Sequence, residues 1–132
     1  MPGWSALLWV ALGGALGSVG RLLVTSAAAR AFGSAFPWGT VAVNVAGSFA
    51  MGVMAVWVTR HWADGTGVRL FLMTGLLGGF TTFSAFSLEA VLLLERGQSG
   101  TAFFYMAASV VLSLGALGAG LMATRSLFPE TL

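Results

Sequence analysis

Four long apolar segments alternate with short polar connectors along the chain. The segments run roughly over residues 5–28, 38–59, 68–94 and 101–124. A helix needs about 20 apolar residues to cross the hydrocarbon core of a bilayer, and each segment meets that length. The connectors have no room for a second domain. The pattern therefore predicts an all-α membrane protein, with one integral membrane domain over residues 1–132 and four transmembrane helices.

The third segment contains a sequence that is unusual for a continuous membrane helix. Residues 78–86 read GGFTTFSAF, with glycines, threonines and a serine between apolar flanks. Gly78 and Gly79 weaken a helix, and the Thr-Thr pair after them is able to cap a new one. We expect the third helix to be broken near Gly78–Thr82. Broken backbone at membrane depth is tolerated only where it is buried in protein or lines a cavity, so the break is a candidate site.

The two half-helices at such a break suit ions of opposite sign. The first half ends in free carbonyl groups, which suit a cation, and the second begins with free N–H groups, which suit an anion. Beyond the break, Phe83 and Phe86 share a helical face. The edge of a phenyl ring is electropositive, so a ring held edge-on to a path attracts a desolvated anion. Ordinary packing is the alternative role for both rings.

Polar residues recur at four-residue spacing in the second and fourth segments, so each set shares one helical face. The two stripes are Thr40, Asn44 and Ser48, and Tyr105, Ser109 and Ser113. The amide of Asn44 is the most costly group to bury, because hydrocarbon offers it no partner. It either bonds to another helix or lines a water-filled path. Isolated serines often bond back to their own helix, so the two stripes matter more than any single hydroxyl.

Only 8% of the residues are charged, too few to cover the surface of a soluble domain. Apart from Arg69, at the start of the third span, two charged residues fall inside predicted spans. Arg21 lies near the end of the first span, where it is either functional or extends its guanidinium to the membrane surface. Glu89 follows Phe86 by three residues, nearer a membrane face, and is expected to be a solvated acid in a vestibule.

Several functional classes are disfavoured by the composition. The chain has no cysteine, which excludes disulfides and thiolate metal sites. Its net charge of +2, without a basic run, does not predict nucleic-acid binding. The single histidine, His61, lies in a loop beside Trp62 and Asp64, and no nucleophile–base pair accompanies it. An enzyme is therefore not expected.

The arginines give almost no orientation bias. Four spans put both termini on one side, which would hold Arg60, Arg69 and Arg125. The other side would hold Arg30 and Arg96, and also Arg21 if it is counted, so the two sides differ by one arginine or none. Either another feature fixes the topology, or the chain inserts both ways and opposite copies pair about a twofold axis in the membrane plane.

Small residues, including Gly13-x-x-x-Gly17 and the GALGAG of the fourth segment, favour close helix packing and an oligomer. The tryptophans lie near span ends, as in an interfacial belt, although Trp9 and Trp57 suit buried packing equally.

Taken together, these motifs resemble the Fluc family of fluoride channels, also called CrcB proteins. The similarity covers nearly the whole chain and rests on GGALGSVGR, GTVAVNVAGSF, GLLGGFTTFSAFSLE and the polar stripe of the fourth segment. One departure is visible, because family members commonly read TTFSTF where this chain has Ala85.

The resemblance implies a passive, selective channel that lets fluoride leave the cell down its electrochemical gradient and so relieves fluoride toxicity. It implies an antiparallel, dual-topology homodimer with two pores in a prokaryotic plasma (inner) membrane. Arg21 would lie at a vestibule. A structural Na⁺ on the twofold axis would be held by backbone carbonyls of Gly78 and Thr81 from both subunits. The implied pore residues are Phe83, Phe86, Asn44, Thr40, Ser109, Ser113 and Tyr105.

Two other readings compete with this one. Small four-span drug exporters are also dual-topology dimers, but they work through an acidic residue in the first span, which this chain lacks. An assembly subunit of a larger membrane complex would explain the small-residue faces but not the broken third helix. Composition and spacing do not distinguish fluoride from chloride.

Overall fold

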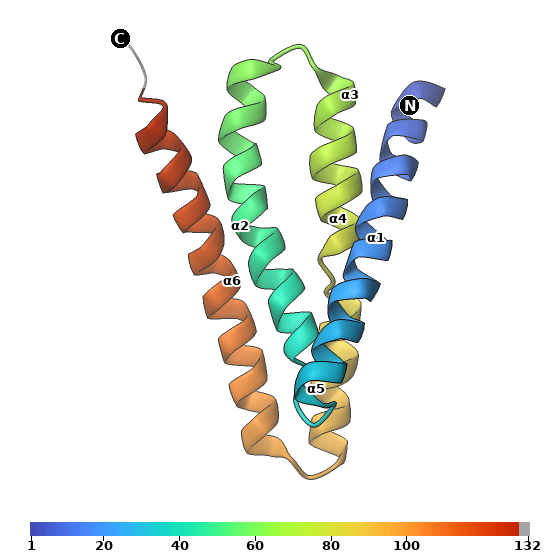
Figure 1. Cartoon of the computed structure of the whole chain (residues 1–132), viewed down its shortest axis with the longest axis vertical. Helices are drawn as coiled ribbons and strands as arrows, with labels where there is room; N and C mark the ends of the chain where they lie inside the picture. Colours follow the sequence, from blue (N-terminus) through green and yellow to red (C-terminus); the bar gives the residue numbers. More distant parts are fainter. Residues whose placement is uncertain (130–132) are drawn as a thin grey trace.

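The computed structural model describes residues 1–129 and consists of four long helical rods joined by short turns (Figure 1). Each rod is long and apolar enough to cross a membrane, which confirms four long apolar helices at the predicted positions. Each observed rod also extends to or beyond the predicted ends, because the flanking polar residues continue the helix. The elements are α1 (Trp4–Phe32), α2 (Trp38–His61), α3 (Thr66–Arg69), η1 (Leu70–Leu77), α4 (Gly78–Phe80), α5 (Ser84–Glu95) and α6 (Ser99–Leu127).

The rods run alternately up and down, so the start of α1 and the end of α6 lie at the same end of the molecule (Figure 1). The third rod comprises α3, η1, α4 and α5. The closest packing occurs between α2 and α6 and between α1 and η1. The break in the third rod faces α2, because the side chain of Asn44 reaches it from there.

The third rod is broken, as predicted, although the break does not fall on the glycines. α4 ends at Phe80, Thr81 has extended backbone, and α5 begins at Ser84. The Thr82 hydroxyl accepts a hydrogen bond from the N–H of Ala85 at 3.1 Å, so a threonine caps the second half as expected. Gly78 and Gly79 are themselves helical, so the break lies at the C-terminal end of the predicted range.

Before the break, η1 is a π-helix, which the sequence did not predict. A π-helix closes its hydrogen bonds one residue later than an α-helix and is frequent at functional sites. No residue in LFLMTGLL is a recognised signal for this winding. The segment lies against α1, so its winding coincides with the closest approach of two backbones.

The glycines of α1 allow that approach. A Cβ on Gly13 would overlap the Phe71 carbonyl oxygen and lie 2.8 Å from the Leu76 nitrogen. A Cβ on Gly17 would overlap the Leu76 carbonyl oxygen. The predicted packing role of the Gly13-x-x-x-Gly17 pair is confirmed. In α6 the same role holds for Gly120, which lies against Phe49, whereas Gly115 and Gly118 face open space in the subunit.

The Gly13 contact predicts a clear difference between neighbouring substitutions. Gly13→Ala is expected to destabilise the fold by about 1–3 kcal/mol, because the backbone of η1 cannot move aside as a flexible side chain would. Gly14→Ala is the matched control, since its Cβ would meet nothing nearer than the Gly75 oxygen at 4.0 Å. Thermal unfolding in detergent measures both, and equal midpoints would contradict the packing assigned to Gly13.

Candidate functional site

A groove of about 440 Å³ lies where the broken third rod meets α2 and α6. It brings together most of the pore residues expected from the sequence, and Gly78 and Thr81 of the expected cation site also line it. Thr40 and Tyr105 do not line it. The lining residues that matter here are Asn44, Ser48, Thr81, Thr82, Phe83, Phe86, Ser109 and Ser113.

The side chain of Asn44 links α2 to the broken backbone of the third rod. Its Oδ1 accepts from the N–H of Thr82 at 2.7 Å, and its Nδ2 donates to the Thr82 carbonyl at 2.9 Å. This reciprocal pair fixes the orientation of the amide, because the backbone donor requires the oxygen and the backbone acceptor requires the nitrogen. Nδ2 carries a second N–H, which neither of these bonds uses. Asn44 therefore satisfies the broken backbone and still has a donor available at the groove.

Two hydroxyl groups in the groove have no hydrogen-bond partner. The oxygens of Ser109 and Ser113 are buried and unpaired, and Ser109 as a residue is only 5% exposed. An unsatisfied buried hydroxyl costs about 1–3 kcal/mol, so such groups normally have a partner. Both residues belong to the predicted stripe of α6. Their position on the groove wall makes them donors for water or an ion.

Aromatic rings form the end of the groove near the break. The centroids of Phe83 and Phe86 lie 5.5 Å apart, with an angle of 43° between the ring planes. Phe86 lies 5.3 Å from Tyr105, which is fully buried. Phe83 is 78% exposed on the subunit surface. The two phenylalanines therefore share a face, as predicted, and Phe86 joins the groove to the interior of the bundle.

A second polar group lies beyond Phe86. The Glu89 carboxylate accepts from the Thr40 hydroxyl at 2.9 Å and from the Tyr105 hydroxyl at 2.7 Å. The same carboxylate lines a separate cavity of about 240 Å³, together with Thr40 and Arg96. The expected polar track thus has two parts, with the Phe86–Tyr105 contact between them.

The sequence did not reveal the partners of Glu89. Glu89 lines a cavity, and its oxygens are hydrogen-bonded to two residues expected in the pore, so its place in a vestibule stays a prediction. Thr40, Glu89 and Tyr105 belong to three different elements, so only the tertiary fold brings them together. Spacing along the chain gives no signal for such a cluster.

Carbonyl groups at the break fit a cation. In residues 1–129, no backbone N–H outside the helices donates to the carbonyl of Gly78 or of Thr81. The normal helical donor for Gly78 would be the N–H of Thr82, which is bonded to Asn44 instead. Gly78 is also exposed on the subunit surface. Oxygen atoms of this kind are ligands that hard cations prefer.

Arg21 lies further from the end of its helix than its expected position near the end of the first span. α1 continues to Phe32, so Arg21 lies well inside the helix, where it is half-buried. It does not line the groove. Its role at a vestibule stays a prediction.

The chemistry available in the groove is that of neutral donors. No cluster of His, Asp or Glu able to hold a metal ion occurs among residues 1–129. The groove supplies a spare amide N–H, unpaired hydroxyls and phenyl edges, without a lysine or arginine among its lining residues. Such a set is able to replace part of the water around a small anion, and it lacks a fixed positive charge that would retain the ion.

Comparison with known proteins gives a consistent family assignment. The family model described as "CrcB-like protein, Camphor Resistance (CrcB)" matches residues 8–121. A Rhizobium etli protein is 56% identical over 120 residues, which cover 91% of this chain and 96% of its own. A Cereibacter sphaeroides protein is 59% identical over 121 residues, covering 92% and 95%, respectively. A Rhodospirillum centenum protein is 52% identical over 120 residues, covering 91% and 95%. All three are named "Fluoride-specific ion channel FluC".

Proposed function

This chain belongs to the CrcB family, and from that premise we propose that it is a passive, selective fluoride channel in a bacterial membrane. The proposal transfers to this chain the activity in the names of its relatives. The protein is then a transporter and not an enzyme. The observation that supports the proposal most directly is the groove, in which neutral donors and ring edges converge at membrane depth.

Each group has a role in stripping and stabilising fluoride. The ion exchanges water for the spare Asn44 N–H and for the hydroxyls of Ser109 and Ser113. The edges of Phe83 and Phe86 then provide partial positive charge beside the break. Because all of these charges are partial, binding stays weak enough for the ion to leave again.

Fluoride that passes Phe86 meets the second polar group. The hydroxyls of Thr40 and Tyr105 already donate to Glu89. An incoming anion competes with that carboxylate for the same two protons. Arg96 lines the same cavity as Glu89, and its positive charge offsets the negative charge of the Glu89 carboxylate at this end of the path.

We propose an antiparallel, dual-topology homodimer with two pores. The near-equal distribution of arginines between the two sides supports insertion in both orientations. Phe83 supports a partner surface beside the pore, because most of its ring is exposed although it adjoins the groove. An identical subunit, with the surrounding bilayer, would cover that ring.

We also propose a structural Na⁺ on the twofold axis, held by the carbonyls of Gly78 and Thr81 from both subunits. The missing backbone donors at both carbonyls and the exposure of Gly78 support this site. When bound, the cation would supply positive charge that neutralises converging carbonyl dipoles. This chain contributes rigid oxygens, fixed by the Asn44–Thr82 pair.

The proposed sodium site predicts that the dimer depends on Na⁺ during purification. Protein isolated throughout in N-methylglucamine, a cation too large for the site, is expected to dissociate to monomer at protein concentrations where the Na⁺ preparation stays dimeric. Chemical cross-linking in detergent measures the two populations. Isolation in K⁺ at the same ionic strength controls for salt effects. Equal dimer fractions in all three preparations, with no sodium retained in the N-methylglucamine protein by elemental analysis, would contradict the site.

The cellular role follows from the direction of the gradient. We propose that the channel resides in the inner membrane and lets fluoride run out of the cell, which prevents its accumulation. Expression in a bacterial strain without its own fluoride exporter is expected to restore growth in fluoride. A small drug exporter would instead protect against cationic dyes, and an assembly subunit would protect against neither. Absence of fluoride protection with protein present in the membrane would contradict this role.

A further inference from the structure

A basic site lies at the end of the molecule where α1 begins and α6 ends. Arg60 is in the last turn of α2 and Arg125 is in the last turn of α6. Both line a cavity of about 450 Å³, whose remaining walls are Ala55, Val56 and Thr59. This Arg60–Arg125 pocket shares no lining residue with the groove of the proposed pore.

The donors of the pocket are the two guanidinium groups. The Thr59 hydroxyl donates to the Ala55 carbonyl at 2.8 Å, so its proton is not available to a ligand. Within residues 1–129, no acidic side chain lines the pocket. Two guanidinium groups are well suited to phosphate, because each presents parallel N–H donors that match its oxygens.

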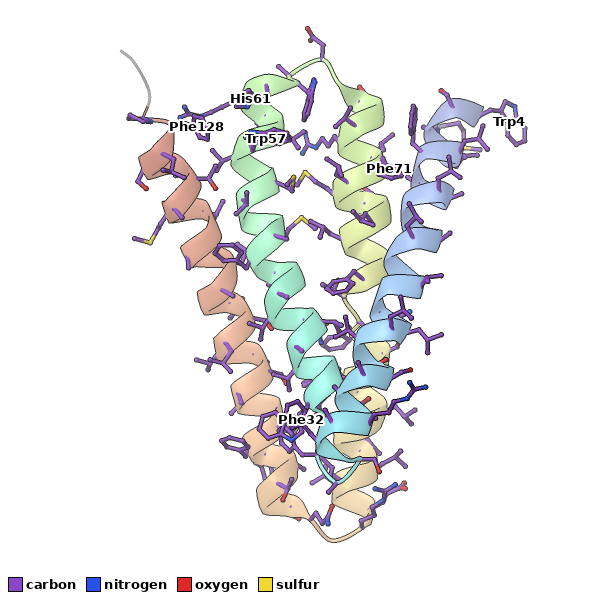
Figure 2. The ribbon with its side chains drawn as sticks, viewed as in Figure 1. Trp4, Phe32, Trp57, His61, Phe71 and Phe128 are labelled. Atoms are coloured by element: carbon purple, nitrogen blue, oxygen red, sulfur yellow. The ribbon has the colours of Figure 1, made fainter. Side chains whose placement is uncertain are left out.

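The depth of the pocket places it at the level of lipid headgroups. Both arginines lie at the ends of predicted spans. An aromatic cluster lies at the same depth in the membrane. The centroid of the His61 ring lies 5.3 Å from that of Trp57 and 5.5 Å from that of Phe128. Figure 2 shows these three side chains at one end of the molecule, beside the ends of α2 and α6. Tryptophan is typical of the membrane–water interface.

The apolar walls of the pocket favour a lipid over a soluble anion as its ligand. Ala55 and Val56 precede Arg60 in α2, so they lie about one helical turn deeper in the membrane. The pocket therefore offers positive charge at the surface and apolar side chains below it. A ligand with a phosphate above an acyl chain matches both parts, whereas a free phosphate matches only the first.

We infer that the Arg60–Arg125 pocket binds the phosphate headgroup of an anionic phospholipid. The lipid bridges the ends of α2 and α6. This site does not depend on the proposed fluoride function, because none of its residues belongs to the groove.

Native mass spectrometry of the purified protein tests the inference. The protein is titrated with phosphatidylglycerol or with zwitterionic phosphatidylcholine in a neutral detergent. Wild type is expected to bind phosphatidylglycerol more tightly. Arg60→Gln and Arg125→Gln each weaken that binding about fivefold, and the double variant about thirtyfold. Arg69→Gln, at the same end but outside the pocket, leaves it unchanged.

Three results would overturn the inference. The first is wild-type affinity in the double glutamine variant, and the second is equal binding of the two lipids by wild type. The third is displacement of phosphatidylglycerol by millimolar inorganic phosphate, which would identify a soluble-anion site. If the double glutamine variant does not fold, the double lysine variant replaces it. Lysine keeps the charge but loses the paired donors, so its affinity should be intermediate.

Discussion

Replacing Phe86 by isoleucine is expected to lower fluoride flux at least about a hundredfold while the protein stays folded. The ring of Phe86 lies between Phe83 and Tyr105, at the junction of the groove with the interior. Isoleucine keeps the apolar volume approximately but has no electropositive edge. A fluoride ion at this point would then lose its water without gaining a partner, which raises the barrier to conduction. A rise of about 2.7 kcal/mol in that barrier lowers the rate about a hundredfold.

Phe103→Ile is the matched control for this prediction. Phe103 lies on α6, is largely exposed and does not line the groove. Its replacement is expected to leave the flux within about twofold, because surface substitutions rarely exceed 0.5 kcal/mol. Elution as a folded oligomer verifies both variants before transport is measured. A Phe86→Ile protein with normal flux would refute the role assigned to the ring edge.

Asn44→Ala is the second substitution with a large expected effect. It leaves the N–H and the carbonyl of Thr82 without their partners at the break. Each unsatisfied backbone group costs about 1–3 kcal/mol, so the fold should lose roughly 2–6 kcal/mol. Flux should also fall, since the spare donor of the amide is removed from the groove. Thermal unfolding in detergent and fluoride efflux measure the two effects separately.

Two companion variants separate structure from transport at this position. Asn44→Asp keeps an acceptor for the Thr82 N–H but loses the donor to the Thr82 carbonyl and places a negative charge beside the groove, so it should lower flux further than Asn44→Ala does. Ser48→Ala changes the same face of α2 one turn further along, and is expected to alter stability by less than about 1 kcal/mol. Wild-type stability in Asn44→Ala would contradict the role of this amide in holding the break.

The four spans and the break were predictable because each follows from local composition. Apolar length alone determines a membrane span, and the hydroxyls after Phe80 mark the start of a new helix. The exact position of the break was not predictable. Gly79 stays helical because it lies against α1, where a Cβ would be 2.6 Å from the Gly14 carbonyl oxygen. Gly79 therefore serves the packing of α4 against α1, and the threonines after it form the break.

The candidate site was predictable as a set of residues but not as an arrangement. The four-residue spacing identified Asn44 and Ser109, and the groove brings them together. The pairing of Asn44 with the Thr82 backbone depends on how α2 crosses the break. Likewise, Glu89 obtains its partners only when α2 and α6 are packed beside α5. Local patterns carry no information on such contacts.

The most direct test of the proposed function is passive efflux from liposomes that contain the purified protein. Fluoride and chloride electrodes record the two anions in parallel, and a potassium ionophore supplies the balancing charge. Rapid loss of fluoride with chloride retained is the predicted result, and Phe86→Ile should abolish it. Equal loss of both anions would contradict fluoride selectivity, and retention of both would contradict a channel formed by this chain alone.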